Sequence, residues 1–513
     1  MKLFIKRSAP VLGLLGLGLA GCQPDIDAPK VSAGSADFSR YVSVGNSLTG
    51  GTADGGQYRE SQLNSYPNIL ASQFALVGGG TFLQALFSET QSNGSGYLRL
   101  AGFTPATATS LPAPITASVT TNLAIRGAVP TRTSPLPRPQ PLYTKDLSDI
   151  NNLGIDGIRM SDITTAGFGN SASTGGTFAA PTPVFNAYFE RITPDGSNES
   201  YLDRVKRTVA SIKPTFFTEW LGNNDVLGFA TAGAAANSVT PAATFTANTK
   251  LVLDALTAGG AKGVVATIPD VTNIPFFTTV GPSFRANLAL NNTPVTVAPF
   301  IYTTGLLAPG QPNTRVLTAK LSDIGNAPGT AGNLLLTLTA SPYLSLYGRA
   351  TGKYWRDFYQ QARPNLPPTY TLAQFLGPAA LGGLAIDTTK AFGQDPANPF
   401  PSTLVLDPTE QASIVSTTNA FNTTLTTEAN ARNLAIFDAN IFFRSVAASG
   451  FATNAVNNTA GYLSGNLFSL DGVHPTPRGY AVIANEMLRV INAKYGSTFQ
   501  GVNANNYRGV VFP

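Results

Sequence analysis

The sequence of 513 residues has one cysteine and one histidine, and charged residues make up only 12% of it. A single cysteine excludes an internal disulfide. Ordinary soluble domains carry about 25% charged residues, and the chain lacks any Lys/Arg cluster that would indicate binding to nucleic acid or another anionic polymer. It also lacks a fixed-period repeat and an apolar run long enough to cross a membrane. What it has instead, 50 Gly, 37 Pro and abundant Thr, Ser and Asn, is typical of a loop-rich extracytoplasmic protein.

The N-terminus has the pattern of a secretion signal. Lys2, Lys6 and Arg7 precede an apolar run over 9–20, and the sequence Leu-Ala-Gly then leads directly to Cys22. The run is too short to span a bilayer. We therefore predict a signal peptide over residues 1–22 with a lipoprotein-type cleavage box, in which Cys22 is the point of lipid attachment rather than a nucleophile or ligand.

The residues after Cys22 predict a flexible tether over 23–36, which is rich in Pro, Ser and Gly. Its start, Cys-Gln-Pro-Asp-Ile-Asp, resembles the acidic export signals of some surface-exposed Gram-negative lipoproteins. Once residues 1–22 are removed, 30 Lys and Arg face 28 Asp and Glu, so the basic balance of the full chain comes in part from the signal. The expected location is extracytoplasmic, lipid-anchored to a bacterial membrane, with the outer membrane and the cell surface as the favoured site.

The remaining chain alternates between strand-like and helix-like segments. Strand patterns occur at 41–44, 214–221, 263–268 and 434–437, and helix patterns occur at about 245–258, after Asp407-Pro408-Thr409-Glu410, and after Thr476-Pro477. The last two helices begin with an N-cap residue followed by proline. Strands separated by helices predict an α/β fold with a parallel sheet covered on both faces and functional loops at the carboxyl ends of the strands.

Two long segments interrupt this alternation, at about 78–149 and about 276–401. Both are rich in Pro, Thr and Gly. Their positions between core strands indicate insertions into one domain, 37–513, rather than a separate tandem domain. A role as surface decoration and a role in shaping a substrate pocket are both compatible with the sequence.

Three residues have the chemistry of a nucleophilic hydrolase. Ser47 follows the first strand, in Gly-Asn-Ser-Leu, while Asp471 and His474 lie three positions apart in Asp-Gly-Val-His-Pro. A serine nucleophile needs a base, and the base needs a group that orients it. Histidine is the side chain whose unperturbed pKa suits a general base near neutrality. Each residue also has a simpler interpretation, as a helix cap, a turn former or a hydrogen-bonded core histidine.

Two further segments could supply donors to the oxyanion that such a reaction forms. Asn224 lies in Gly-Asn-Asn-Asp directly after the strand-like segment 214–221, and Gly157 lies in Asn-Asn-Leu-Gly-Ile-Asp-Gly, where its backbone N-H could approach a ligand. Gly154 is an alternative donor in the same segment. Taken alone, each segment would more often be a turn.

Together and in this order, the blocks around Ser47, Gly157, Asn224 and Asp471/His474 resemble the four sequence blocks of the SGNH or GDSL esterase/lipase family, over about residues 38–493. The resemblance implies a three-layer, flavodoxin-like α/β hydrolase fold. It also implies a catalytic set in which Ser47 is the nucleophile, His474 the base and Asp471 its partner. The oxyanion donors would then be the backbone N-H groups of Ser47 and Gly157 and the side chain of Asn224. The first block departs from the family in having Asn46 where Asp is usual, and this position is outside the catalytic set.

The function expected from these blocks is hydrolysis of carboxylic esters through an acyl-enzyme, by a membrane-anchored lipoprotein that needs no metal and no cofactor. The alcohol and acyl chain stay open: lipids, short-chain esters and O-acylated glycans are all candidate substrates. Two alternatives also stay open. One is an acyltransferase that uses the same site, and the other is a surface binding protein on a degenerate hydrolase fold.

Overall fold

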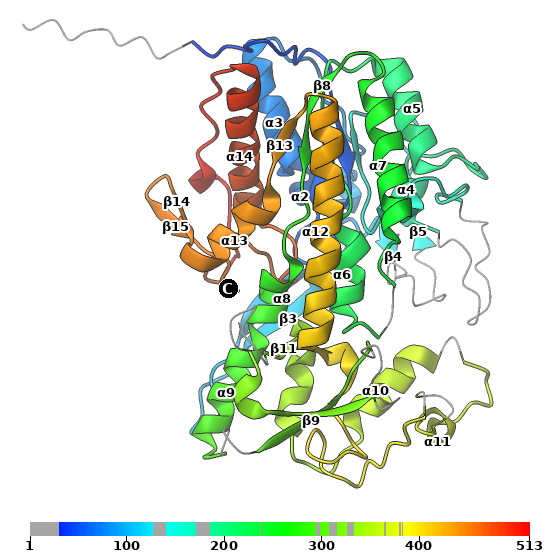
Figure 1. The fold of residues 1–513 in the computed structure, drawn as a ribbon, viewed down its shortest axis with the longest axis vertical. Helices are drawn as coiled ribbons and strands as arrows, with labels where there is room; N and C mark the ends of the chain where they lie inside the picture. Colours follow the sequence, from blue (N-terminus) through cyan, green and yellow to red (C-terminus); the bar gives the residue numbers. More distant parts are fainter. Residues whose placement is uncertain are drawn as a thin grey trace, which may run out of the picture.

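A computed structural model describes residues 30–126, 140–170, 185–235, 238–293, 298–306, 315–325, 333–363, 366–378, 381 and 383–513. A parallel five-stranded sheet forms its centre (Figure 1). The strands are β1 (Tyr41–Gly45), β6 (Asn152–Gly154), β7 (Phe216–Trp220), β8 (Lys262–Ala266) and β13 (Ala435–Phe437). Across the sheet they lie in the order β13-β8-β7-β1-β6, and each pairs in parallel with its neighbours.

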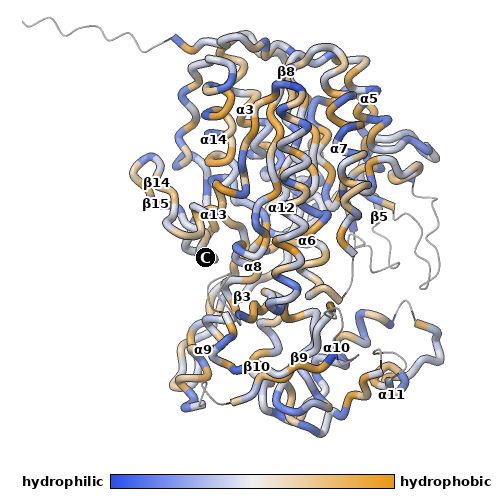
Figure 2. Tube along the Cα trace, in the orientation of Figure 1, coloured by the Kyte–Doolittle hydropathy of each residue, from blue (hydrophilic) through white to orange (hydrophobic). Residues whose placement is uncertain are grey.

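Helices cover both faces of this sheet. On one side lie α3 (Tyr66–Phe74) and α14 (Pro477–Tyr495), which pack against each other; on the other side lie α5 (Tyr201–Ile212), α7 (Ala242–Thr257) and α12 (Pro408–Ala431), where α7 contacts both neighbours. In Figure 2 apolar and polar residues alternate along these helices, as expected for helices that bury one face. The predicted α/β class, with a parallel sheet between two helical layers, is thereby confirmed.

The order of the strands determines where a ligand can bind. Numbered along the chain, the sheet has the order 2-1-3-4-5, which is the order of flavodoxin-like doubly wound sheets. The direction of winding reverses between β1 and β7, and connections leave these two strands toward opposite faces. In open α/β sheets the crevice at the carboxyl ends of such a pair is the usual ligand site.

Local sequence signals account for most of these elements. Every residue of β1 and β7 is buried, as expected for strands covered on both faces. In α12 the Asp407 side chain accepts from the N-H of Glu410 and the Glu410 carboxylate accepts from the N-H of Asp407, which is the predicted capping box. Thr476 also caps its helix, α14, because its Oγ1 accepts from the N-H of Gly479. Strand β6 was not predicted, because its three residues lie in an Asn-rich segment that reads as a turn.

Residues 78–149 contribute mainly a two-stranded ribbon to the described structure. It is formed by β2 (Tyr97–Phe103) and β3 (Pro114–Val119), and a short pair follows, β4 (Ile125–Arg126) with β5 (Gln140–Pro141). The tip of the ribbon is bonded to α9 (Val280–Leu290), because the N-H of Leu111 donates to Asn287 Oδ1 and Asn291 Nδ2 donates to the carbonyl of Thr109. The two inserted segments therefore contact each other.

Residues 276–401 form a second apolar cluster that is separate from the core around the sheet. It lies in the lower part of Figures 1 and 2 and includes Phe300, Trp355, Phe392 and Phe400. The elements of this segment are α9, α10 (Lys353–Ala362), α11 (Leu372–Phe375), β9 (Pro299–Thr303), β10 (Val316–Lys320) and β11 (Leu335–Leu336), the last paired with β12 (Val405–Leu406).

The remaining α-helices and strands of the described residues are α1 (Ser47–Gly50), α2 (Arg59–Leu63), α4 (Ala187–Glu190), α6 (Asn223–Thr231), α8 (Pro275–Thr278), α13 (Ala439–Ser449), β14 (Phe451–Thr453) and β15 (Val456–Asn458).

The C-terminal part of the expected tether lies on the domain. The N-H of Ser32 donates to Thr498 Oγ1, that of Ser35 donates to the carbonyl of Tyr495, and Ala36 is buried. Residues 32–36 therefore belong to the packed structure rather than to a free linker. The predicted signal peptide, Cys22 and residues 23–29 lie outside the described residues. Within the described part of the chain, no helix has the length and apolar character needed to span a membrane.

Candidate active site

Ser47 lies where β1 ends, at the first position of the short helix α1. The preceding residue, Asn46, is fully buried and caps α1, because its Oδ1 accepts from the N-H of Leu48 at 3.0 Å. A carboxylate at position 46 would accept the same hydrogen bond, so the amide found here can take over this structural role. The cap fixes the strand-to-helix turn, and Ser47, at 7% exposure, is held at the carboxyl edge of the sheet.

His474 contacts Ser47 directly. Its Nε2 lies 2.9 Å from Ser47 Oγ, and its Nδ1 lies 2.7 Å from Asp471 Oδ2. Because an ionised carboxylate can only accept, Nδ1 is the protonated nitrogen of the neutral ring, and Nε2 is free to accept from the serine hydroxyl. The three side chains thus form one hydrogen-bonded series, Ser-His-Asp, in the order that a nucleophile, a base and an orienting group require.

Asp471 is fixed by its own loop and by the loop after α1. Its Oδ1 accepts from the N-H groups of Val473 and His474, at 2.9 and 2.8 Å, and Oδ2 also accepts from the N-H of Gly55 at 2.8 Å. Burial by itself would raise the pKa of Asp471, but the adjacent His474 and these hydrogen bonds lower it below its ordinary value. The carboxylate is therefore ionised at neutral pH and held in one orientation.

Asn224 lies in the first turn of α6, directly after β7 and across the switch point from Ser47. Its Nδ2 donates to the carbonyl of Ile158 at 2.9 Å, which leaves the second N-H of the amide available to a ligand. The next residue, Asp225, accepts from the N-H of Met160 at 2.7 Å and from the hydroxyl of Thr240. These two neighbours bind the loop that follows Gly157 to the start of α6.

The structure distinguishes between the two candidate glycines. Gly157 has φ +75°, a conformation that favours glycine, and it is exposed, with no neighbour within 4 Å of where a Cβ would be. Gly154 instead lies in β6 against α1, where a Cβ would be 2.1 Å from the N atom of Gly50, and its N-H is bonded to Asn152 Oδ1. Gly154 therefore allows close packing and has a bonded N-H, whereas Gly157 is exposed and stays the expected oxyanion donor.

Among the described residues, no acceptor is bonded to the backbone N-H of Ser47 or to that of Gly157. Together with the second amide N-H of Asn224, they are three donors on the segments that directly follow β1, β6 and β7, three neighbouring strands that end at the same edge of the sheet. Such donors can stabilise the negative charge that develops on a carbonyl oxygen when a hydroxyl adds to it.

Three carboxylates act electrostatically on the imidazole of His474, and one of them, Asp471, contacts it. Burial by itself would lower the pKa of His474, but the negative charge of Asp471, its hydrogen bond, and the charges of Asp156 and Asp54 raise it above the ordinary value. Burial raises the pKa of Asp54 and brings that of Asp156 to about 6. The environment therefore favours imidazolium, the form that a general base reaches after it takes a proton.

The sequence analysis did not identify two apolar residues beside the histidine loop. The N-H of Phe276 donates to the carbonyl of Gly472 at 2.9 Å, and Leu338 lies close enough that a Cβ on Gly472 would be 3.3 Å from its Cδ2. Both side chains are partly exposed. They belong to the second insertion, so this segment borders the site two residues before His474. No sequence pattern marks either residue, because the contact depends on how the insertion folds.

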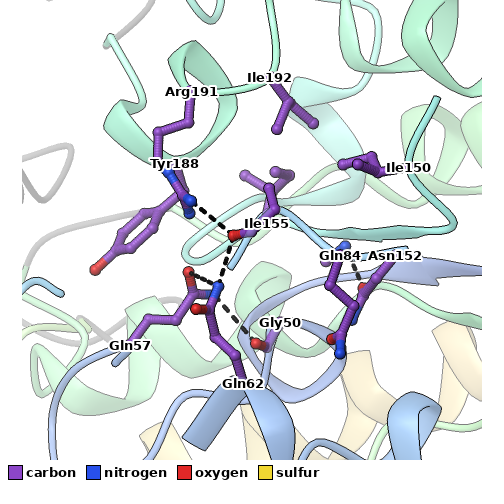
Figure 3. A pocket seen from close by; sticks show the side chains of 12 residues that line it. Gly50, Gln57, Gln62, Gln84, Ile150, Asn152, Ile155, Tyr188, Arg191 and Ile192 are labelled. Atoms are coloured by element: carbon purple, nitrogen blue, oxygen red, sulfur yellow. Dashed lines mark hydrogen bonds between the residues drawn. The ribbon is translucent and has the colours of Figure 1, made fainter. Parts of the chain in front are cut away.

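A small cavity lies behind the turn that carries Ser47 (Figure 3). Its volume is about 20 Å³, enough for roughly one water molecule. Gln57, Gln62 and Arg191 point into it, and Gly50 forms its floor in this view. Ser47 and His474 are absent from its lining, so this cavity is separate from the Ser-His-Asp series.

Within the described part of the chain, no cluster of three or more His, Cys, Asp or Glu side chains has the arrangement of a metal site.

Comparison with known proteins found no match for this chain among protein-family models, curated protein sequences or solved structures.

Proposed function

We propose that this protein is a serine ester hydrolase of the SGNH/GDSL type, which cleaves carboxylic esters through an acyl-enzyme on Ser47. The observation that carries the proposal is the series Ser47 Oγ, His474 Nε2 and Nδ1, and Asp471 Oδ2, with distances of 2.9 and 2.7 Å. The series lies at the carboxyl end of β1, at the switch point of a doubly wound sheet. Further support for the proposal comes from three groups that could form an oxyanion hole: the unbonded N-H groups of Ser47 and Gly157 and the side-chain amide of Asn224.

The reaction follows from these contacts in two steps. His474 Nε2 takes the proton of Ser47 while Oγ forms a bond to the ester carbonyl carbon, and the carbonyl oxygen becomes an oxyanion that the donors stabilise. His474 then gives the proton to the alcohol oxygen, the ester bond breaks and an acyl-enzyme remains. In the second step a water molecule gives a proton to Nε2 while its oxygen forms a bond to the acyl carbon. His474 then returns this proton to Ser47 Oγ as the bond between Oγ and the acyl carbon breaks, which releases the carboxylic acid and free Ser47.

Labelling with a fluorophosphonate tests the proposal directly, because this reagent forms a bond only with an activated serine. The wild-type protein should be labelled on Ser47 and should hydrolyse at least one member of a p-nitrophenyl ester series from acetate to palmitate. A folded Ser47→Ala variant should do neither. If the wild type is not labelled, the site is inactive, and a binding protein on a hydrolase fold becomes the better interpretation. Faster acyl transfer to an alcohol or sugar than to water would identify an acyltransferase.

We also propose that the protein is anchored to a bacterial membrane by lipid on Cys22. The support is the sequence alone: a basic start, a short apolar run and a Leu-Ala-Gly-Cys box. This proposal is independent of the chemistry at Ser47 and has its own test in the Discussion.

A further inference from the structure

Asp156 directly precedes Gly157, and its carboxylate points back toward the turn that carries Ser47. Its Oδ2 accepts from the hydroxyl of Thr52, and its Oδ1 accepts from Gln57 Nε2 at 3.1 Å. The side chain is almost fully buried, at 9% exposure. A carboxylate buried this deeply costs free energy unless it is hydrogen-bonded, and both of its oxygens are bonded here.

Thr52 links this carboxylate to the nucleophile. Its backbone N-H donates to the carbonyl of Ser47 at 3.0 Å, while its hydroxyl donates to Asp156. Thr52 is therefore hydrogen-bonded both to the nucleophile Ser47 and to Asp156, the neighbour of Gly157. On the far side, the carbonyl of Asp156 accepts from Asn186 Nδ2 at 2.8 Å, so the backbone beside Gly157 is held from two directions.

Gln57 provides a second link. Its Nε2 is shared between Asp156 Oδ1 and the carbonyl of Gly50 at the end of α1, and its Oε1 accepts from Gln62. Figure 3 shows Gln57 and Gln62 side by side next to Gly50. Both hydrogen bonds to the Asp156 carboxylate therefore come from the segment 47–57, which begins with the helix that carries Ser47.

We propose that Asp156 is a positioning residue of the candidate esterase site, whose carboxylate holds the Gly157 loop against the turn after Ser47 and so sets the spacing of the two backbone oxyanion donors. The inference rests on the proposed function. Oxyanion donors act only when they are already placed for the transition state, and a displacement of about 1 Å can cost as much as 100-fold in rate. A tether between the two loops is therefore expected to affect turnover more than substrate binding.

The charge of Asp156 has a second effect, on His474. Ionised Asp156 favours the imidazolium form of His474, as do Asp471 and Asp54. Besides His474 and Asp471, the titratable groups that interact electrostatically with Asp156 are the phenols of Tyr188 and Tyr480. Removing the charge of Asp156 removes a stabiliser of the charged ring. The pKa of His474 then falls. The acidic limb, which is the part of the pH profile where activity rises as His474 loses its proton, therefore moves to lower pH. A residue that acts only on loop stability would not move this limb.

Two substitutions separate the effects. Asp156→Asn removes the charge and turns one of the two acceptor oxygens into an N-H donor, so the bond from Thr52 or the bond from Gln57 is reversed or lost. We expect kcat to fall by roughly 10- to 100-fold with little change in KM, and the acidic limb to shift to lower pH. Thr52→Val removes one hydrogen-bond donor and keeps the carboxyl group, so it should lower kcat. Because the lost bond also raises the pKa of Asp156, the acidic limb should move down less than in Asp156→Asn, in which the charge is absent at every pH. Glu219→Gln is the matched control, since Glu219 is also a buried carboxyl but lies within β7; it should leave both kcat and the acidic limb unchanged.

Folding of each variant is checked by thermal unfolding before kinetics. An Asp156→Asn enzyme with wild-type kcat and an unmoved acidic limb would overturn the inference. If that variant does not fold, Thr52→Val decides, and wild-type kcat in it has the same consequence. Failure of the proposed function would look different: the wild type itself would resist fluorophosphonate and hydrolyse no ester.

Discussion

Ser47 and His474 are separated by 427 positions in the chain, and their reactive atoms, Oγ and Nε2, lie 2.9 Å apart. One follows the first strand of the sheet and the other precedes the last helix, α14. Because α3, in the connection after β1, and α14, the C-terminal helix, pack against each other on one face of the sheet, the two ends of the domain meet at the carboxyl edge of β1. The fold therefore assembles the pair, and the catalytic prediction depends on both residues at once.

Ser47→Ala and His474→Ala should each reduce kcat by about 10⁴-fold or more, and the double variant should lose little beyond either single one, because nucleophile and base act as a unit. Asp471→Asn should also cost about 10⁴-fold, since an amide at this position favours the wrong tautomer of the imidazole. Steady-state hydrolysis of a p-nitrophenyl ester measures all four. Losses that multiply in the double variant would contradict a shared mechanism.

The pH dependence of the wild type tests the environment of His474. Only neutral imidazole can accept the proton of Ser47, and Asp471 and the neighbouring carboxylates raise the pKa of the ring. Activity should therefore rise with pH through a single ionisation above the unperturbed value of about 6.5. A pH-stat assay of kcat/KM gives the profile. A midpoint below the unperturbed value would mean that burial, which by itself lowers this pKa, outweighs the carboxylates.

Asn224→Ala should lower kcat by about 100- to 1000-fold while KM changes little, because it removes one of three donors from the oxyanion hole. The neighbouring Asn223→Ala is a matched control. Its amide is buried and makes no hydrogen bond within the described structure, so its loss should affect turnover much less. Since Asn224 also bonds the carbonyl of Ile158, both variants need a thermal unfolding measurement. Equal effects of the two substitutions on kcat would remove Asn224 from the proposed donors.

Much of the sheet could be predicted from the sequence because its signals are local. The capping box of α12 involves residues three positions apart, and β1 and β7 are short segments rich in β-branched and aromatic residues. The same is true of Asp471 and His474, which belong to one loop. Strand β6 escaped prediction because three residues give no periodicity, and it is a strand only through its pairing with β1.

The supporting contacts of the site could not be predicted in this way. Asp156 and Thr52 are 104 positions apart, and each occurs in a segment whose composition suggests an ordinary turn. The choice between Gly154 and Gly157 likewise needed the backbone conformation and the packing of α1 on β6. Side-chain contacts between loops depend on the tertiary fold, and a single sequence carries no local pattern for them.

Replacing Cys22 by serine should release the protein from the membrane or block its processing, while esterase activity stays intact. Each buried methylene of an attached acyl chain contributes about 0.8 kcal/mol to membrane binding, and one chain alone holds a protein only marginally. Fractionation of cells that produce the wild type and Cys22→Ser measures the distribution. The same membrane-bound fraction for both proteins would exclude lipid on Cys22 as the anchor.

Phe276 and Leu338 provide a test of the second insertion as part of the substrate site. The backbone of Phe276 and the Cδ2 atom of Leu338 lie against Gly472 in the histidine loop, and both residues are partly exposed. We expect their side chains to form an apolar wall on the acyl side of the candidate site. Phe276→Ala and Leu338→Ala should therefore lower kcat/KM for long-chain esters relative to acetate esters, by about tenfold or more, because each removed methylene in an apolar pocket is worth about 1–3 kcal/mol.

The control for this prediction is Leu317→Ala, a substitution in the same insertion at an exposed leucine on β10. It should leave the ratio of long-chain to acetate rates unchanged, because Leu317 faces solvent away from the second apolar cluster. Hydrolysis of p-nitrophenyl acetate must persist in all three variants, since none of these residues belongs to the proposed catalytic series. If Phe276→Ala and Leu338→Ala keep the wild-type ratio in folded protein, the wall does not contact the acyl chain, and the selectivity must come from other residues around Ser47.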